Sequence, residues 1–120
     1  MTVSGRLAFV SGQVALDADG KLVGAGDLRA QAAQALRNLH GVIRALGADW
    51  ADVVRFGWYV LDVTKVQDIR DARDEQIRPM KGDGEAGGDH PNPASTLVQV
   101  ASLFRPEFLV EVDAVVALPG

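Results

Sequence analysis

The chain has 120 residues, which is the length of one domain and too short for two separate hydrophobic cores. It is 48% hydrophobic and 23% charged, as in globular proteins, and its net charge of −4 without a lysine–arginine cluster argues against nucleic acid as a partner. The absence of cysteine excludes disulfides, thiolate catalysis and cysteine-based zinc sites.

The first predicted elements are two short strands. Residues 6–10 (RLAFV) predict the first strand, and residues 14–16 (VAL) predict a second one after Ser11-Gly12-Gln13. Residues 17–20 (DADG) have the composition of a tight turn, because Asp and Gly tolerate its backbone angles. The N-terminal region is therefore predicted to be a strand followed by a hairpin-like excursion.

The clearest predicted helix begins after Asp27 and ends at Gly47. Asp27 can accept hydrogen bonds from the N–H groups of the first turn, and Gly47 is the residue type at which helices end. Apolar residues between them recur at helical spacing in one stripe: Leu28, Ala32, Ala35, Leu36, Leu39, Val42, Ile43 and Leu46. This stripe predicts a helix of about five turns that packs on a core.

A strand and a second helix are predicted next. Residues 53–61 (VVRFGWYVL) predict a strand buried on both faces, because a half-exposed strand would alternate apolar and polar residues. The helix is predicted over 62–80, with Asp62 or Thr64 as its N-cap. Its narrower apolar stripe consists of Val66, Ile69, Ala72, Ile77 and Met80.

The C-terminal third predicts a loop and two strands. Residues 82–93 (GDGEAGGDHPNP) predict a flexible acidic loop. Strands follow over 95–103 and 108–118, joined by a turn that contains Pro106. The predicted fold is α+β in the order β-β-α-β-α-β-β, one domain over residues 1–120, with a sheet backed by two helices.

This layer count also predicts self-association. Two helices can cover one face of such a sheet, but the strands at 53–61 and 108–118 are rich in apolar residues on both faces. An uncovered second face would expose a large apolar patch to water. We therefore expect copies of the chain to cover it in a closed symmetric oligomer.

The order of elements and four segments resemble the RidA/YjgF family of enamine/imine deaminases, also called endoribonuclease L-PSP. The segments are FVSGQ at 9–13, QAAQALRNLHGVIRALGA in the first helix, VVRFGWYVLDV in the strand after it and LVEVDAVVA at 109–117. The resemblance implies a chorismate-mutase-like fold and a barrel-like homotrimer whose sheets pack inward around an axis. It also implies a cleft at each subunit interface, where water attacks the C=N carbon of a small imine or enamine acid.

The resemblance assigns roles to four positions. Glu111 matches the water-activating glutamate and is the candidate catalytic residue, and Gly12 matches a residue whose backbone lines the cleft. Leu97 stands where a small polar residue or cysteine is usual. Ser95 stands where the family has the arginine that binds the substrate carboxylate, so turnover of 2-iminopropionate is expected to be weak unless Arg6 or Arg105 of a neighbouring subunit supplies the charge.

Three of these positions also have a purely structural interpretation. Glu111 can be a member of an interface ion pair, Gly12 a turn glycine and Leu97 a core leucine. If the last two strands pair antiparallel, Ser95, Glu111 and Gly12 converge on one cleft, and Asp113 shares the face of Glu111. Without the family arginine, Glu111 has less compensating charge and a drier setting, so its pKa should be raised.

The sequence leaves three functions open. The first is an enzyme that hydrolyses a small imine, enamine or related C–N substrate, and the second is a non-catalytic trimer that binds a small molecule. The third, RNA cleavage or inhibition of translation, is disfavoured by the acidic charge. No cofactor or nucleic-acid partner is expected.

Metal binding and export are not expected either. Asp83, Glu85, Asp89 and His90 are too loosely spaced to predict a metal site, and His40 is predicted to be structural. No basic and apolar leader follows Met1, so no signal peptide is expected. No apolar run approaches the roughly 20 residues that span a bilayer. We expect a cytoplasmic protein without a membrane partner.

Overall fold

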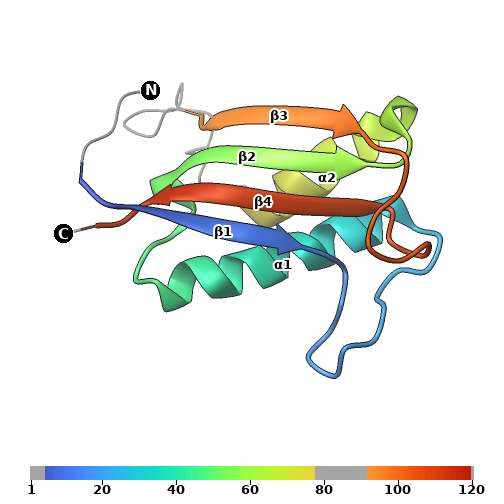
Figure 1. The fold of residues 1–120 in the computed structure, drawn as a ribbon, viewed down its shortest axis with the longest axis horizontal. Helices are drawn as coiled ribbons and strands as arrows, with labels where there is room; N and C mark the ends of the chain where they lie inside the picture. Colours follow the sequence, from blue (N-terminus) through green and yellow to red (C-terminus); the bar gives the residue numbers. More distant parts are fainter. Residues whose placement is uncertain (1–4, 78–91, 120) are drawn as a thin grey trace.

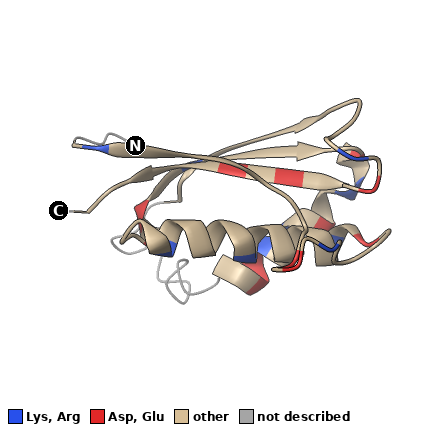
Figure 2. Ribbon diagram, turned by 60° about the horizontal axis from the view of Figure 1, so that its bottom comes forward, with Lys and Arg blue, Asp and Glu red and all other residues tan. Residues whose placement is uncertain are grey.

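The computed structural model describes residues 5–77 and 92–119 as one sheet with two helices on one of its faces (Figure 1). The strands are β1 (Leu7–Gln13), β2 (Val53–Val60), β3 (Ala94–Gln99) and β4 (Val110–Ala117), and the helices are α1 (Leu28–Ala45) and α2 (Val66–Ile77). Short 3-10 turns, Trp50–Asp52 and Val63–Lys65, precede β2 and α2. Figure 2 shows both helices on the same side of the sheet. The predicted α+β fold with a sheet backed by two helices is confirmed.

The strand order is β1-β4-β2-β3, which corrects the predicted pairing of the last two strands. β4 is antiparallel to both β1 and β2, whereas β3 pairs with β2 in parallel. The reason is the crossover through α2, which returns the chain to the end of the sheet at which β2 began and lays β3 beside it. β2 therefore separates β3 from β4.

The predicted strand at 14–16 is also wrong. Leu16 forms only an isolated bridge with Leu22, while β1 continues instead to Gln13. The carbonyl groups of Val14 and Leu16 accept hydrogen bonds from Nδ2 of Asn38 on α1, at 2.9 and 2.8 Å. A helix side chain thus satisfies groups that a strand would place in a ladder, and the observed order is β-α-β-α-β-β.

The predicted limits of the first helix are confirmed. Asp27 Oδ1 accepts from the N–H of Ala30 at 3.0 Å, and Gly47 has a φ of 81° just beyond the helix. Most of the predicted stripe is buried, but Val42 and Leu46 are 37% and 42% exposed. They lie at the border of the stripe, beyond the width that the sheet covers.

The second helix starts later than predicted. Asp62 caps the 3-10 turn by accepting from the N–H of Thr64 at 3.0 Å, and α2 then begins at Val66. Ile69, Ala72 and Ile77 are buried as predicted. The remainder of the predicted helix, at 78–80, and the glycine-rich loop up to residue 91 lie outside the described residues.

β4 shows which face of the sheet the helices cover. Val110, Val112, Ala114 and Val116 are buried beneath them, and the residues between these are only partly buried. Within one chain the two central strands are therefore not buried on both faces as predicted. In the part of the chain that the structure describes, no element covers the second face, which we call the open face (Figures 1 and 2).

Candidate functional site

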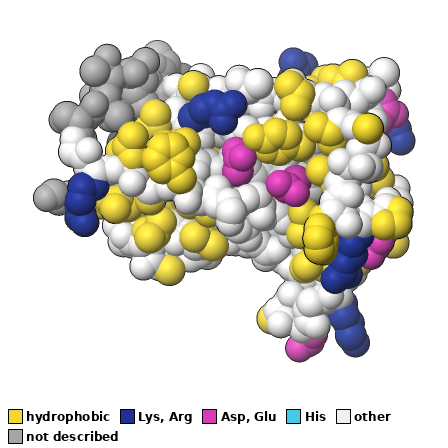
Figure 3. All heavy atoms as spheres, in the orientation of Figure 1, with side chains coloured by type: hydrophobic (Ala, Val, Ile, Leu, Met, Phe, Trp, Pro, Cys, Tyr) yellow, Lys and Arg dark blue, Asp and Glu magenta, His cyan; other side chains and the backbone are white. Residues whose placement is uncertain are grey.

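The open face has an apolar half and a polar half. Leu7 and Phe9 of β1, 41% and 78% exposed, lie beside Ala117 and Val115 of β4 in the apolar half. The polar half, which we call the polar cluster, consists of Arg55, Gly57 and Tyr59 of β2 with Glu111 and Asp113 of β4. In Figure 3, acidic side chains lie near the centre of this face with a basic side chain close by, surrounded by hydrophobic ones.

Gly12 gives Glu111 its place on the sheet. β1 carries one extra residue against β4 between Val10 and Gln13, and Gly12 lies in this bulge. A Cβ atom on Gly12 would lie only 2.0 Å from Oε2 of Glu111. Gly12 is therefore a strand residue and not a turn glycine, and the predicted association of these two residues is present within one chain.

The carboxylate of Glu111 is unpaired and partly buried. It makes no hydrogen bond or ion pair with any residue that the structure describes. Burial raises the pKa of Glu111, and the negative charge of Asp113 raises it further. The predicted direction of the shift is confirmed; burial is the drier setting that was expected, and the charge of Asp113 adds to it. Such a carboxylate can take up and release a proton closer to neutral pH than an exposed one.

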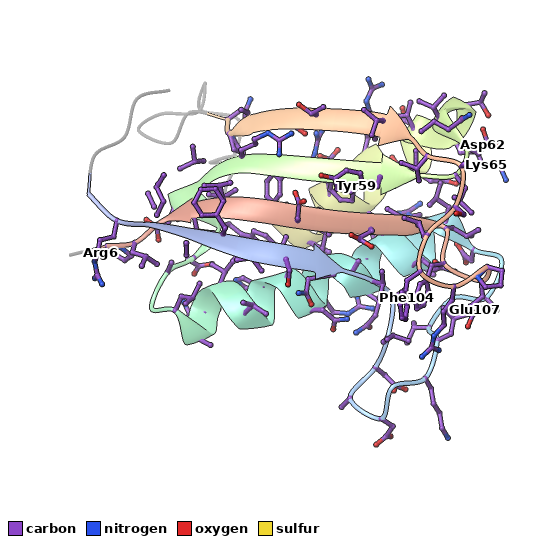
Figure 4. All side chains as sticks on the ribbon, in the orientation of Figure 1. Arg6, Tyr59, Asp62, Lys65, Phe104 and Glu107 are labelled. Atoms are coloured by element: carbon purple, nitrogen blue, oxygen red, sulfur yellow. The ribbon has the colours of Figure 1, made fainter. Side chains whose placement is uncertain are left out.

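Asp113 is held by β2. The hydroxyl of Tyr59 donates to Asp113 Oδ2 at 3.0 Å, and Arg55 Nη1 lies 3.9 Å from Asp113 Oδ1. A Cβ atom on Gly57 would lie 2.3 Å from Asp113 Oδ1, so only glycine leaves room for this carboxylate. The hydrogen bond to Asp113, followed by burial, raises the pKa of Tyr59 and keeps its hydroxyl a donor. Tyr59 lies across the middle of β2 and β4 (Figure 4).

Ser95 and Leu97 do not join the polar cluster within one chain. In the parallel pairing they lie opposite Phe56 and Trp58, whose side chains are buried on the helix side. Both residues therefore share the helix side of the sheet, and Leu97 packs against the core. The antiparallel pairing that would bring Ser95 beside Glu111 is wrong.

Arg55 and Tyr59 are the residues of this cluster that the sequence prediction missed. The signal was present, since positions 55, 57 and 59 alternate with buried Phe56 and Trp58 and must share the opposite face. It was hidden because the aromatic and β-branched residues of this strand suggested burial on both faces.

Within one chain, neither Arg105 nor Arg6 lies in the polar cluster. Arg105 Nη1 is 3.6 Å from Glu107 Oε2, and its guanidinium lies 5.5 Å from the centre of the Phe108 ring. Arg6 lies where β1 begins (Figure 4), whereas Gly12 lies near the end of that strand, against Glu111.

A separate pocket of about 490 Å³ lies where α1 and α2 begin. Its lining residues are Gly26, Asp27, Leu28, Leu61, Asp62, Lys65, Gln67, Asp68 and Leu109. Asp27 and Asp62 already accept hydrogen bonds as N-caps. The pocket shares no residue with the polar cluster, and its acidic side chains serve the helix starts.

Within residues 5–77 and 92–119 no three His, Asp or Glu side chains form a group that could hold a metal ion. The loose set at 83–90 falls outside these ranges. Neither described helix is long and apolar enough to cross a membrane. His40 is structural, as predicted, with Nε2 2.7 Å from Asp49 Oδ1 and its ring stacked on Trp50.

Known proteins resemble this chain over most of its length. A family model described as endoribonuclease L-PSP matches residues 1–118. A RutC family protein of Synechocystis sp. is 30% identical over 112 residues, covering 92% of this chain and 78% of that protein. Protein DfrA of Myxococcus xanthus is 31% identical, covering 93% and 76%.

Solved structures agree. A member of the conserved Rid protein family from Yersinia pestis, YyfB, has a TM-score of 0.80 and 34% identity, covering 98% of this chain and 83% of that one. A putative endoribonuclease from Thermotoga maritima has a TM-score of 0.78 and 28% identity, covering 98% and 84%.

Proposed function

This chain belongs to the RidA/YjgF family, which the endoribonuclease L-PSP model describes, and we propose that it hydrolyses a small imine, enamine or related C–N substrate. Glu111 is the proposed catalytic residue. The observation that carries the proposal is the unpaired, partly buried carboxylate of Glu111, which lies against Gly12 and has a raised pKa.

The proposed chemistry needs one group that accepts a proton and then returns it. Glu111 takes a proton from water as the water oxygen bonds to the C=N carbon, and a carbinolamine forms. When the imine nitrogen carries a proton at the start, the protonated Glu111 then gives its proton to the nitrogen of the carbinolamine. As the C–N bond breaks, the carbinolamine hydroxyl passes its proton to the Glu111 carboxylate, and ammonia leaves from a carbonyl product. Glu111 finally releases this proton to ammonia or to solvent. A carboxylate with a raised pKa suits both steps, since it binds the proton more firmly than an exposed one.

The proposed cleft lies between subunits of a homotrimer. Gly12 and Glu111 of one chain form one wall, and Ser95, which is exposed on the edge strand β3, contributes to the other wall from a neighbouring chain, whereas Leu97 packs against its own core. The exposed apolar half of the open face supports this assembly, because Phe9 is 78% exposed in the isolated chain. RNA is not the proposed substrate, because the carboxylates of Glu111 and Asp113 at the centre of this face would repel phosphates.

The test is imine hydrolysis by a Glu111→Gln variant. With 2-iminopropionate generated in situ from alanine by an amino-acid oxidase, the wild-type protein should accelerate ammonia release measurably, although less than relatives that have the family arginine at the position of Ser95. Glu111→Gln should lower the rate by about 10²–10⁴-fold, the usual contribution of a general acid–base. Glu107→Gln is the matched control, since Glu107 pairs with Arg105 outside the polar cluster.

The outcomes separate the alternatives. Equal turnover by wild type and Glu111→Gln, with the assembly intact, overturns the catalytic assignment. If a small molecule binds saturably but neither protein turns over an imine, the result supports the second candidate, a trimer that binds a small molecule without catalysing a reaction.

A further inference from the structure

Arg55 has hydrogen-bond donors that the fold leaves unused. Its nearest acidic partner is Asp113, whose Oδ1 lies 3.9 Å from Arg55 Nη1, too far for a hydrogen bond, and the Arg55 side chain is 40% exposed. It donates no hydrogen bond to any residue that the structure describes. By contrast, Arg29 and Arg44 donate to Glu75 and Asp49 at 2.7 and 2.9 Å. A guanidinium with free donors is a natural binding group for a carboxylate.

Arg55 is also directed toward the carboxylates of the polar cluster. A Cβ atom on Gly57 would lie 3.0 Å from Arg55 Nη1, so the guanidinium reaches over the glycine toward Asp113. Asp113 and Glu111 occupy alternate positions of β4 and share this face. One cation and two carboxylates thus lie in a row across the middle of the open face.

This charge pattern selects a class of ligand. A carboxylate at Arg55 would form charge-assisted hydrogen bonds with the guanidinium. A protonated nitrogen on the same molecule would lie toward Glu111 and Asp113, which favour positive charge. A neutral or purely anionic molecule would leave one end of the row unmatched.

We propose that Arg55 binds the carboxylate of a small amino or imino acid whose cationic nitrogen lies at Glu111 and Asp113. This assignment deepens the proposed function and rests on it for the identity of the site. Arg55 supplies within this chain the charge that Ser95 does not provide. The site is thereby built for zwitterions that carry the carboxylate close to the nitrogen.

The test compares two ligands that differ only in the carboxylate. L-alanine and L-alaninamide are titrated by calorimetry or ligand-observed NMR into the wild-type protein and into Arg55→Met. The wild-type protein should bind L-alanine at least tenfold more tightly than L-alaninamide. Arg55→Met should lose this preference, and Arg37→Met, a change on α1 where Arg37 donates to Gln34, should keep it.

A second variant keeps the test informative if Arg55→Met fails to fold. Arg55→Lys keeps the positive charge but not the forked donors, so its preference for L-alanine should fall between those of wild type and Arg55→Met. Circular dichroism and the mass in solution should be unchanged in both variants. An undiminished preference in Arg55→Met, or no binding of millimolar L-alanine by the wild-type protein, overturns the proposal.

The two proposals fail separately. If turnover depends on Glu111 but the preference for L-alanine does not depend on Arg55, the proposed function stands and this assignment falls. If the preference depends on Arg55 while no imine is turned over, Arg55 is a ligand-binding residue and the hydrolytic function falls.

Discussion

Two glycines determine where the carboxylates of the open face can stand. A side chain on Gly12 would collide with Glu111, and one on Gly57 would collide with Asp113. On a pleated sheet, neighbouring strands present side chains about 5 Å apart, so a carboxylate that leans over the adjacent strand needs a position without a Cβ atom. The chemistry of this face therefore depends on the missing side chains of Gly12 and Gly57 as well as on its charged residues.

Replacement of Gly12 should separate function from stability. In Gly12→Ala the Glu111 side chain must rotate away, which costs little because it is flexible, so the free energy of unfolding should change by less than about 1 kcal/mol. Imine turnover should fall toward that of Glu111→Gln. Gly41→Ala on α1 is the control, because a Cβ there meets nothing within 4 Å, and it should stabilise the helix by about 0.5–1 kcal/mol without affecting turnover.

The raised pKa of Glu111 predicts how stability depends on pH. Burial and Asp113 raise its pKa in the folded chain, so proton binding favours folding, and this contribution is lost as the pH rises through the raised value. Glu111→Gln, which carries no charge, should therefore unfold at a higher temperature than wild type near neutral pH. The difference should vanish in acid below the ordinary carboxyl range. Thermal unfolding at both pH values checks this, and a less stable Glu111→Gln at neutral pH would show that Glu111 has a compensating cation.

At the scale of elements, one buried amide joins α1 to two loops. Gln31 Nε2 donates to the carbonyl groups of Gly24 and Glu107 at 3.1 and 3.0 Å, and its Oε1 accepts from the N–H of Leu109 at 2.9 Å. Gln31 is fully buried, and it holds the turn after β3 and the approach to α1 against the same helix. These bonds fix the start of β4, two residues before Glu111.

Loss of this amide should be costly. Gln31→Leu keeps a side chain of similar size but leaves the N–H of Leu109 and two carbonyl groups without their partner, at about 1–3 kcal/mol for each buried group that stays unsatisfied. A loss of about 2 kcal/mol or more is expected in urea unfolding. Gln67→Leu, at an exposed position on α2 where Gln67 donates to Asp71, should change stability by less than about 0.5 kcal/mol. Equal losses in the two variants would contradict this role.

At the scale of the whole molecule, the open face of the sheet favours association with another protein surface. One face of the sheet is closed by α1 and α2, while Phe9 and Leu7 project from the other at 78% and 41% exposure. At roughly 25 cal/mol per Å², covering the apolar half would contribute several kcal/mol to association. This is the physical basis on which we propose the homotrimer.

The assembly is tested by the mass in solution. Light scattering or sedimentation should give about three times the chain mass of 12.7 kDa. Phe9→Glu should dissociate the oligomer, because it places a charge in the proposed interface. Val42→Glu is the control, since Val42 is exposed on α1 away from the open face, and its mass should not change. A wild-type monomer at micromolar concentration would contradict the proposal.

Local patterns in the sequence were sufficient for much of the fold. The N-cap at Asp27, the helix end at Gly47 and the buried stripe of α1 depend on residues within a few positions of each other. They could therefore be predicted from the sequence. The neighbourhood of Gly12 and Glu111 came from the resemblance to a known family. The loss of the family arginine at Ser95 was equally visible in the sequence.

The strand order was decided by tertiary structure. Which strands pair depends on the crossover through α2 and on the face that both helices cover, and no local pattern encodes either one. The observed order puts β2 between β3 and β4, so Ser95 turns to the helix side while Arg55 and Tyr59 join Asp113 on the open face. The sequence alone determined the first helix, and its resemblance to a known family pointed to Glu111. Only the packing of the sheet decided which side chains share its open face.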